Sequence, residues 1–317
     1  MRANAYIKII FTIALVQLAA CNRHQDSSMS NLSQSMSESM RTVCVGRYTI
    51  DLPKSATDLK IGQKINGIRI EVQYPADAEL LKHKVAADAQ PGTGKAASKL
   101  INSPNSSPES SIFQISEDGQ DLHTIHGYMI KGDVLYSFTV QVLSDSVVGA
   151  KAAISKLMQL IRPRENLDVP KEAGICIDRG FIPGDREQME SVTMVVNLPE
   201  IKSRFGVDFD SGDQGTKENI ISRMSNLPLP LANFVSQSST IVRREERKID
   251  GRKGDEYDLI DKSAKTASFE WSAMPGEDGV REPGIDATLD SYEAVKDREV
   301  GSLLAAWDAI LNSLKRR

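Results

Sequence analysis

The sequence of 317 residues has few histidines and cysteines and no excess of basic residues. Its 39 Lys and Arg stand against 43 Asp and Glu, so the formal net charge is −4 at pH 7. Proteins that bind nucleic acid gather Lys and Arg on one face to neutralise phosphates, so this balance argues against a nucleic-acid partner. Because 40% of the residues are apolar, the chain can nevertheless bury a hydrophobic core.

Several motifs of catalytic and metal sites are also missing. No Gly-x-Ser-x-Gly sequence occurs, so the nucleophile elbow of serine hydrolases is absent. Residues 92–96 resemble part of a phosphate-binding loop, but Ala89 replaces its first glycine, and residues 208–213 match a calcium loop only loosely. His123 and His126 are three apart on an expected strand, which directs their side chains to opposite faces. We therefore predict no enzymatic activity, no cofactor and no metal site.

Long apolar runs are absent except near the start of the chain, where residues 9–16 follow two basic residues. A run of about 8–12 residues has the length of a signal-peptide core and is too short to cross a bilayer as a helix. Residues 18–21, Leu-Ala-Ala-Cys, resemble a bacterial lipobox, in which the cysteine takes a lipid and becomes the first residue. The resemblance implies a signal peptide over residues 1–20 and a lipid on Cys21. An ordinary secretory signal beside a chance cysteine is the alternative.

Residues 21–42 are rich in serine and poor in aromatic and β-branched residues. Such a segment cannot offset the entropy lost on ordering, so we predict a flexible tether with a reach of about 25 Å. Asn22 after the cysteine resembles lipoproteins sorted to the outer membrane. The expected location is therefore the periplasm, with the N-terminal lipid as the only contact with the membrane.

Two stretches with a similar order of elements follow the tether. In the first, apolar and polar residues alternate over residues 68–74 and 134–142, which is typical of antiparallel strands with one buried face. An amphipathic helix is expected from Val147 and ends before Pro163. In the second stretch the expected elements are strands over residues 192–198, 205–209, 267–273 and 285–289, a helix from Thr216, a hairpin over residues 241–260 and a last helix over residues 300–314.

Each half thus contains strands, a helix, a hairpin and a long helix, and a connector rich in charge and proline separates the halves. We predict the α+β class with two similar domains, each an antiparallel sheet with helices packed on one face. The expected boundaries are residues 43–163 for the N-terminal domain, 164–172 for the linker and 173–317 for the C-terminal domain.

Cys44 and Cys176 stand at the start of the two halves. In an oxidising compartment two remaining cysteines favour a disulfide, which would tie the entrances of the domains together and fix their angle. Two buried free thiols are the alternative, because cysteine is often a small buried apolar residue.

Residues 44–53 (Cys-Val-Gly-Arg-Tyr-Thr-Ile-Asp-Leu-Pro) open the first half, and residues 172–182 (Glu-Ala-Gly-Ile-Cys-Ile-Asp-Arg-Gly-Phe-Ile) open the second. Together with the lipobox and the two-half layout, they resemble the immunity proteins that protect bacteria against class-four type VI secretion lipase effectors. The resemblance covers the chain from Cys44 to the last helix. It implies a periplasmic protein without catalysis that binds a phospholipase of the α/β-hydrolase type. The lipase would be clamped between two α+β domains so that its lid cannot open.

Two segments are candidates for contact with such a lipase. Residues 227–234 are apolar but too rich in proline for a helix or a strand, so they form either an exposed contact patch or a buried loop. The charged hairpin around residues 243–258 is the second candidate. Its acidic residues, which are expected to lie on solvated faces, are Glu245, Glu246, Asp255, Glu256 and Asp258. The candidate contact residues are Leu229, Leu231, Phe234, Arg243, Arg244 and Arg252.

Two other functions compete with inhibition of a lipase. An envelope structural or assembly lipoprotein would bind cell wall or a resident protein and would have no lipase target. A carrier of lipids or solutes would need a large apolar pocket, which neither half indicates. The structural lipoprotein is therefore the alternative to an immunity protein.

Overall fold

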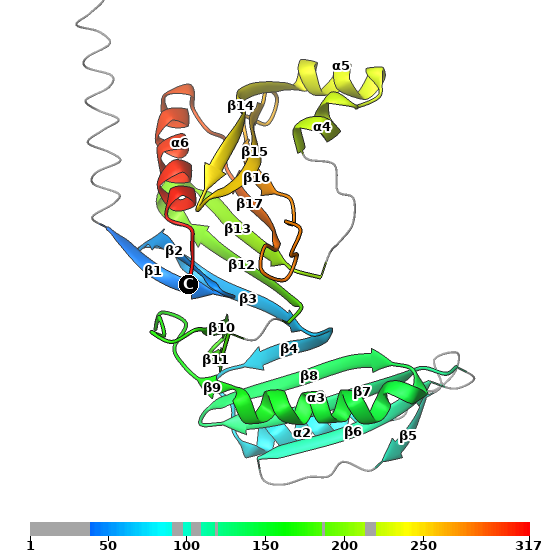
Figure 1. Cartoon of the computed structure of the whole chain (residues 1–317). Coiled ribbons are helices and arrows are strands. Elements are labelled where there is room, and N and C mark those ends of the chain that lie inside the picture. The colour runs from blue at the N-terminus through cyan, green and yellow to red at the C-terminus, as the bar shows by residue number, and fades with distance from the viewer. Residues whose placement is uncertain (1–38, 91–97, 103–108, 118–119, 186–187, 213–219) are drawn as a thin grey trace, which may run out of the picture.

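The computed structural model describes residues 39–90, 98–102, 109–117, 120–185, 188–212 and 220–317 (Figure 1). Cys21, the predicted signal peptide and most of the predicted tether lie outside these residues, as does the loop at residues 92–96. Within the described ranges, no helix is both long enough and apolar enough to cross a membrane.

A single antiparallel sheet runs through both halves and contains twelve strands of the described chain. In spatial order they are β14 (Ser239–Ile249), β15 (Arg252–Asp261), β16 (Ala267–Ala273), β17 (Gly284–Ser291), β13 (Ser203–Asp210), β12 (Glu190–Leu198), β3 (Thr57–Ile65), β4 (Ile68–Gln73), β8 (Val134–Val142), β7 (His123–Lys131), β6 (Ser110–Glu117) and β5 (Ser98–Asn102). The strands β12–β17 come from the second half and β3–β8 from the first. The predicted α+β class, with antiparallel strands and packed helices in each half, is confirmed.

The two halves meet where β3 pairs with β12. The register sets Lys64 opposite Ser191 and Ile61 opposite Met194. Ile61 and Met194 are both buried in the main hydrophobic cluster, so the core continues from one half into the other. The halves therefore share a strand ladder and a core, a connection that the sequence analysis did not predict.

Helices cover both faces of the sheet in the first half, so the prediction of helices on one face only, with a single buried face over residues 134–142, was wrong there. The helices are α2 (Ala78–Asp88), which buries Leu81 and Val85, and α3 (Val147–Leu160), which buries Ile154, Leu157 and Met158. A short 3₁₀ turn, η2 (Ser144–Ser146), leads into α3, which ends before Pro163 as predicted. At Gly127 of β7, a Cβ atom would lie only 2.5 Å from Cγ2 of Ile154, so glycine is required where α3 approaches the sheet.

In the second half, α6 (Asp297–Asn312) packs on one face of the sheet and matches the predicted last helix. Its Trp307 is fully buried, with its ring centroid 6.3 Å from the rings of both Phe205 and Phe269. The remaining helices are η3 (Pro199–Ile201), α4 (Ile220–Ser225) and α5 (Leu229–Ser238). The predicted helix from Thr216 is therefore described only from Ile220.

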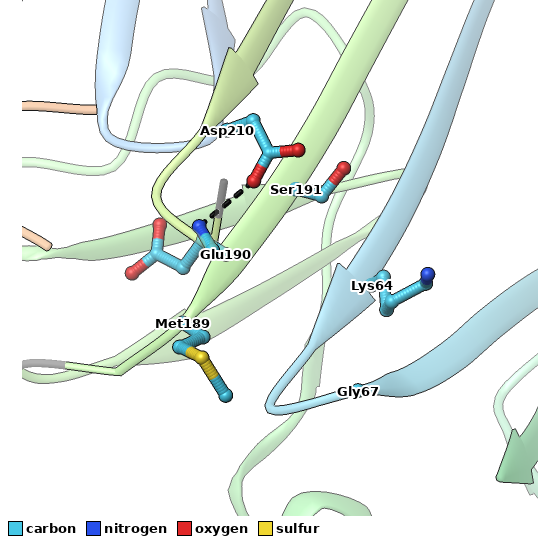
Figure 2. A pocket seen from close by; sticks show the side chains of 7 residues that line it. Lys64, Gly67, Met189, Glu190, Ser191 and Asp210 are labelled. Atoms are coloured by element: carbon cyan, nitrogen blue, oxygen red, sulfur yellow. Dashed lines mark hydrogen bonds between the residues drawn. The ribbon is translucent and has the colours of Figure 1, made fainter. Parts of the chain in front are cut away.

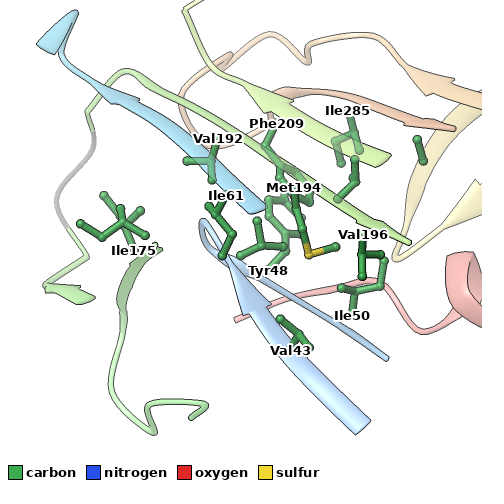
Figure 3. Packing of buried hydrophobic residues seen from close by; sticks show 14 of the residues in the cluster. Val43, Tyr48, Ile50, Ile61, Ile175, Val192, Met194, Val196, Phe209 and Ile285 are labelled. Carbon is green, nitrogen blue, oxygen red and sulfur yellow. The ribbon is translucent and has the colours of Figure 1, made fainter. Parts of the chain in front are cut away.

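Each half also opens with a small hairpin. One sheet joins β1 (Met40–Val45), β2 (Tyr48–Pro53) and β18 (Lys315–Arg316), and the other joins β10 (Gly174–Ile177), β11 (Gly180–Pro183) and β9 (Arg162–Pro163). Figure 3 shows Tyr48 of the first hairpin against the main sheet, where its ring stacks on Phe209 at a centroid distance of 4.2 Å. β1 begins at Met40, so the end of the stretch predicted as a tether, residues 40–42, forms part of a strand.

A disulfide joins Cys44 of the first hairpin to Cys176 of the second, with both side chains fully buried. The backbones of Gly46 and Cys176 exchange two hydrogen bonds of 2.9 and 2.8 Å beside it. Arg317 covers the bond, because its guanidinium donates to Sγ of Cys44 at 3.0 Å and to the carbonyl oxygen of Glu172 at 2.7 Å. Arg317 thus contacts both cysteines of the disulfide that joins the two halves.

Candidate binding surfaces

The proline-rich segment at residues 227–234 is helical from Leu229 onwards, so the prediction that it is neither helix nor strand was wrong. Pro230 occupies the first turn of α5, where a missing backbone N–H leaves no hydrogen bond unmade. Leu229 is 79% exposed, and α5 leads into the start of β14 at the top of the second half (Figure 1), whereas α4 contacts β15. Leu231 and Phe234 lie on the same helix, but their side chains are outside the described part of the structure.

The three candidate arginines of the hairpin have different environments. Nη2 of Arg244 donates to Oγ of Ser225 at 2.6 Å, and this arginine is otherwise exposed. Nη2 of Arg252 donates to the carbonyl oxygen of Met274 at 2.6 Å. Arg243 points instead into the interior between the hairpin and α6. Of the three, Arg244 presents the most accessible guanidinium.

A buried ionic network surrounds Arg243. Its Nη1 donates to Glu256 and to Asp308 of α6, both at 2.7 Å, and Nη1 of Arg247 reaches the same two carboxylates at 3.0 and 2.7 Å. Nε1 of Trp307 donates to Glu256 at 2.6 Å. This network ties the β14–β15 hairpin to the last helix, and its function is structural.

The prediction of solvated acidic faces on this hairpin was wrong for part of the set. Glu245 and Glu246 are exposed, but Asp255 is 8% exposed and Glu256 and Asp258 are fully buried. Local sequence shows only neighbouring Arg and Lys. The cover over Glu256 is supplied by α6, which lies some 50 residues further along the chain, whereas Asp255 points to the opposite face of the sheet.

Asp258 is the most perturbed carboxyl group of this network. Burial, followed by the negative charge of Glu256, raises the pKa of Asp258 to about 8, while Arg243 opposes the shift. No lysine or arginine among the described residues donates a hydrogen bond to either carboxyl oxygen of Asp258. Nη1 of Arg243 lies 3.9 Å from its Oδ2 atom. The raised pKa favours the protonated form of Asp258, which limits the number of buried negative charges.

A polar cavity of about 410 Å³ lies at the junction of the halves (Figure 2). Its lining includes Lys64 from β3, together with Glu190 and Asp210 from β12 and β13. Burial raises the pKa of Glu190, although Nε of Arg47 lies 2.6 Å from its carboxylate and acts in the opposite direction. Among the described residues that line the cavity there is no histidine or cysteine.

The histidines do not form a metal site in the described part of the chain, where no group of three or more His, Cys, Asp or Glu side chains is arranged to hold an ion. His123 bonds to Gln114 and to Ser144 ahead of α3. His126 stacks on Phe113, and burial lowers its pKa. Both rings therefore have structural partners.

The face of the sheet opposite α6 was missed by the sequence analysis. In β13 and β17 the buried residues alternate with polar residues that point away from the core. These polar positions include Asp208 on β13 and both Asp286 and Asp290 on β17. The alternation over residues 205–209 and 285–289 already contained this signal, because it directs every second side chain to the far face.

Comparison with known proteins relates the chain to one group. Residues 168–317 match the family model described as the Tle cognate immunity protein 4 C-terminal domain. The chain is similar to the structure of a Tle4–Tli4 complex, with 23% identity, a TM-score of 0.73 and coverage of 89% of this chain and 98% of that chain. No curated protein matches the sequence.

Two further structures, both of the type VI secretion immunity protein TplEi from Pseudomonas aeruginosa, are similar. The apo structure shares 24% identity with a TM-score of 0.70, covering 88% of this chain and 97% of that chain. The complex with the "L" peptide shares 21% identity with a TM-score of 0.66, covering 88% and 98%. These likenesses establish the fold. Residues 168–317 thus match the family model of the Tle cognate immunity protein 4 C-terminal domain, and the chain has the fold of these solved structures.

Proposed function

We propose that this chain is an immunity protein that binds and inhibits a cognate type VI secretion phospholipase of the α/β-hydrolase type in the periplasm. The family match over residues 168–317 is the observation that carries this proposal. A similar structure is described as a complex of Tle4 with Tli4, and its immunity chain supports the same kind of partnership here. The protein acts by binding and has no catalysis of its own.

The clamp mechanism needs two halves that hold a fixed relation. Three connections support this: the β3–β12 strand pair, the Cys44–Cys176 disulfide and the Arg317 side chain across it. A body of this kind loses little conformational entropy when it binds, because its surfaces are already in place. We infer that the effector is held between the two halves so that its lid cannot open.

The proposed location is the periplasm. Cys21 is proposed as the lipid-bearing residue, with residues 1–20 removed and the anchor in the outer membrane. The proposed tether of residues 21–42 would have a reach of about 25 Å between the lipid and the body. Palmitate labelling, with Cys21→Ser as the control, tests this anchor: label that persists in the variant would refute it.

The inhibitory function is tested by toxicity. A lipase of the α/β-hydrolase type, if the neighbouring reading frame encodes one, is sent to the periplasm of a host cell, with and without this protein. We expect lysis without the protein and growth with it. Growth that is not restored, although the protein reaches the periplasm folded, would contradict the proposal and favour the structural lipoprotein.

The contact surface is proposed to include α5 and the exposed side of the hairpin, with Leu229, Leu231 and Phe234 on the helix and Arg244 beside it; Arg243 and Arg252 contribute by positioning the hairpin. Leu229→Asp with Phe234→Asp should weaken lipase binding by at least about tenfold, since a central apolar contact contributes about 1–3 kcal/mol. Val148→Asp is the matched control, because Val148 is an 80% exposed apolar residue on α3. Unchanged affinity in the α5 variant would remove this helix from the interface.

A further inference from the structure

The outer face of the second half carries an unusual concentration of carboxylates. Asp208 of β13 lies directly opposite Asp286 of β17 in the strand register, and Asp290 and Glu270 flank them on β17 and β16. Side chains directly opposite each other in an antiparallel pair have Cβ atoms about 5 Å apart, and like charges in such pairs are destabilising. We name Asp208, Asp286, Asp290, Glu270 and Asp255 the acidic face.

Hydroxyl groups of adjacent strands orient three of these carboxylates. Thr193 donates to Asp208 at 2.6 Å, Ser272 to Asp286 at 2.5 Å and Ser268 to Asp290 at 2.6 Å. Each bond crosses from one strand to the next. The carboxylates are therefore held in place on a rigid ladder, as a preorganised surface requires.

A cation from elsewhere in the chain already rests at one edge of this face. Arg223 of α4 places Nη2 3.6 Å from Oε1 of Glu270. Burial raises the pKa of Glu270, Arg223 opposes this, and Asp286 and Asp290 add to the rise. The face thus accepts a guanidinium from an element that packs against it.

Asp255 supplies an independent observation at the same edge. It is 8% exposed, faces Ser272 across the β15–β16 pair and lines a cavity of about 170 Å³ with it. No hydrogen-bond donor among the described residues reaches its Oδ2 atom. A buried carboxylate oxygen without a donor is costly, so a donor brought by a ligand would remove this penalty.

We propose that the acidic face is a docking surface for a basic patch of the effector, formed by Arg and Lys side chains. This inference rests on the proposed function and assigns a second contact region to it, away from α5. Charge complementarity identifies the partner chemistry, because guanidinium and ammonium groups pair with carboxylates and would supply the donor that Oδ2 of Asp255 lacks.

Titration of the purified neighbouring lipase with the full chain at low and high sodium chloride tests the inference. Asp208→Asn with Asp286→Asn keeps the side-chain shapes and removes two charges. We expect about tenfold weaker binding at low salt and a shallower dependence on salt. Thermal unfolding should show that the variant is at least as stable as the native protein, because a repulsive pair is gone. If the double variant fails to fold, Asp290→Asn replaces it.

The control removes two exposed carboxylates from the connector, as Glu165→Gln with Glu172→Gln. Equal weakening in the control would mean that net charge alone acts, which overturns the assignment of the face. Unchanged binding by the acidic-face variant overturns it too, while leaving the proposed function standing. Failure of the native protein to bind the lipase overturns both.

Discussion

The two halves of the shared sheet differ in how their faces are covered. In the first half α2 and α3 enclose the sheet from both sides, and β8 is buried without interruption from Val134 to Phe138. In the second half α6 covers one face, α4 lies against β15 on the other with Arg223 beside Glu270, and β13 alternates between buried and partly exposed side chains. The same antiparallel architecture thus gives an enclosed sheet in the first half and a polar, partly covered face in the second.

The difference indicates that the sheet of the first half serves internal packing, whereas the second half has side chains available for contact with a partner. An antiparallel sheet with one face in water needs polar side chains there, and serine or threonine would meet that need. The second half instead places Asp208 opposite Asp286, and a hydroxyl donor orients each carboxylate. The proposed contact with a basic partner would use these oriented carboxylates.

The largest effect is expected at Trp307, which anchors α6 to the sheet. Trp307→Ala should lower the free energy of unfolding by about 3–5 kcal/mol, because it leaves a cavity and removes the donor of Glu256. Chemical denaturation measures the change. Phe113→Ala, in the α2 cluster of the first half, is the counterpart. A smaller loss for Trp307 than for Phe113 would contradict the dependence of the second half on a single helix layer.

The disulfide between the halves comes next. Replacing both cysteines, as Cys44→Ala with Cys176→Ala, should reduce the free energy of unfolding by about 2–4 kcal/mol, because the bond links residues 132 apart and restricts the unfolded chain. Denaturation of the variant and of the reduced native protein gives the value. If the halves then unfold in two separate transitions, the bond unites them; a single transition would show that β3–β12 pairing suffices.

The periodic spacing of apolar residues predicted the elements that turn one face toward the core and the other toward solvent. The stripe of α6 and the alternation over residues 68–74, 134–142 and 285–289 indicated the correct structures, because each pattern depends only on local sequence. The pairing of β3 with β12 could not be found in this way. It joins residues more than 120 apart, and either strand could have been an edge.

The candidate surfaces were predicted less well. Glu256 and Asp258 have charged sequence neighbours, yet α6 buries them, and no local pattern shows that distant cover. The helix α5 was missed because proline was treated as excluding helix, although it fits the first turn. The alternation places Asp208 and Asp286 on the polar side of their strands. Only the strand order shows that they lie opposite each other.

The buried carboxyl group of Asp258 should make stability depend on pH. Its pKa is about 8 when folded and 3.8 when exposed, so the folded state keeps a proton that the unfolded chain releases. The free energy of unfolding should therefore fall as pH rises from about 4 to about 8, by up to about 1.4 kcal/mol per unit, and then level off. Urea denaturation across this range measures the slope.

Asp258→Asn should flatten this dependence, since the amide does not titrate, and should be more stable than the native protein above pH 8. Asp145→Asn, at an exposed position of the first half, is the control and should leave the slope in place. If the free energy of unfolding of Asp258→Asn changes with pH as steeply as that of the native protein, another buried group of the second half causes the dependence.

The smallest effect on stability is expected at Leu229. Comparing it with a buried leucine separates contact with a partner from packing in the core. Leu229→Ala should change the free energy of unfolding by less than about 0.5 kcal/mol, because the side chain is 79% exposed. Leu303→Ala in α6 should cost about 2–5 kcal/mol, because that leucine is 3% exposed. Denaturation and lipase binding are measured on both variants. Leu229→Ala should bind the lipase more weakly and keep the stability of the native protein. A large loss of stability instead would show that α5 is packed in the protein, as α6 is.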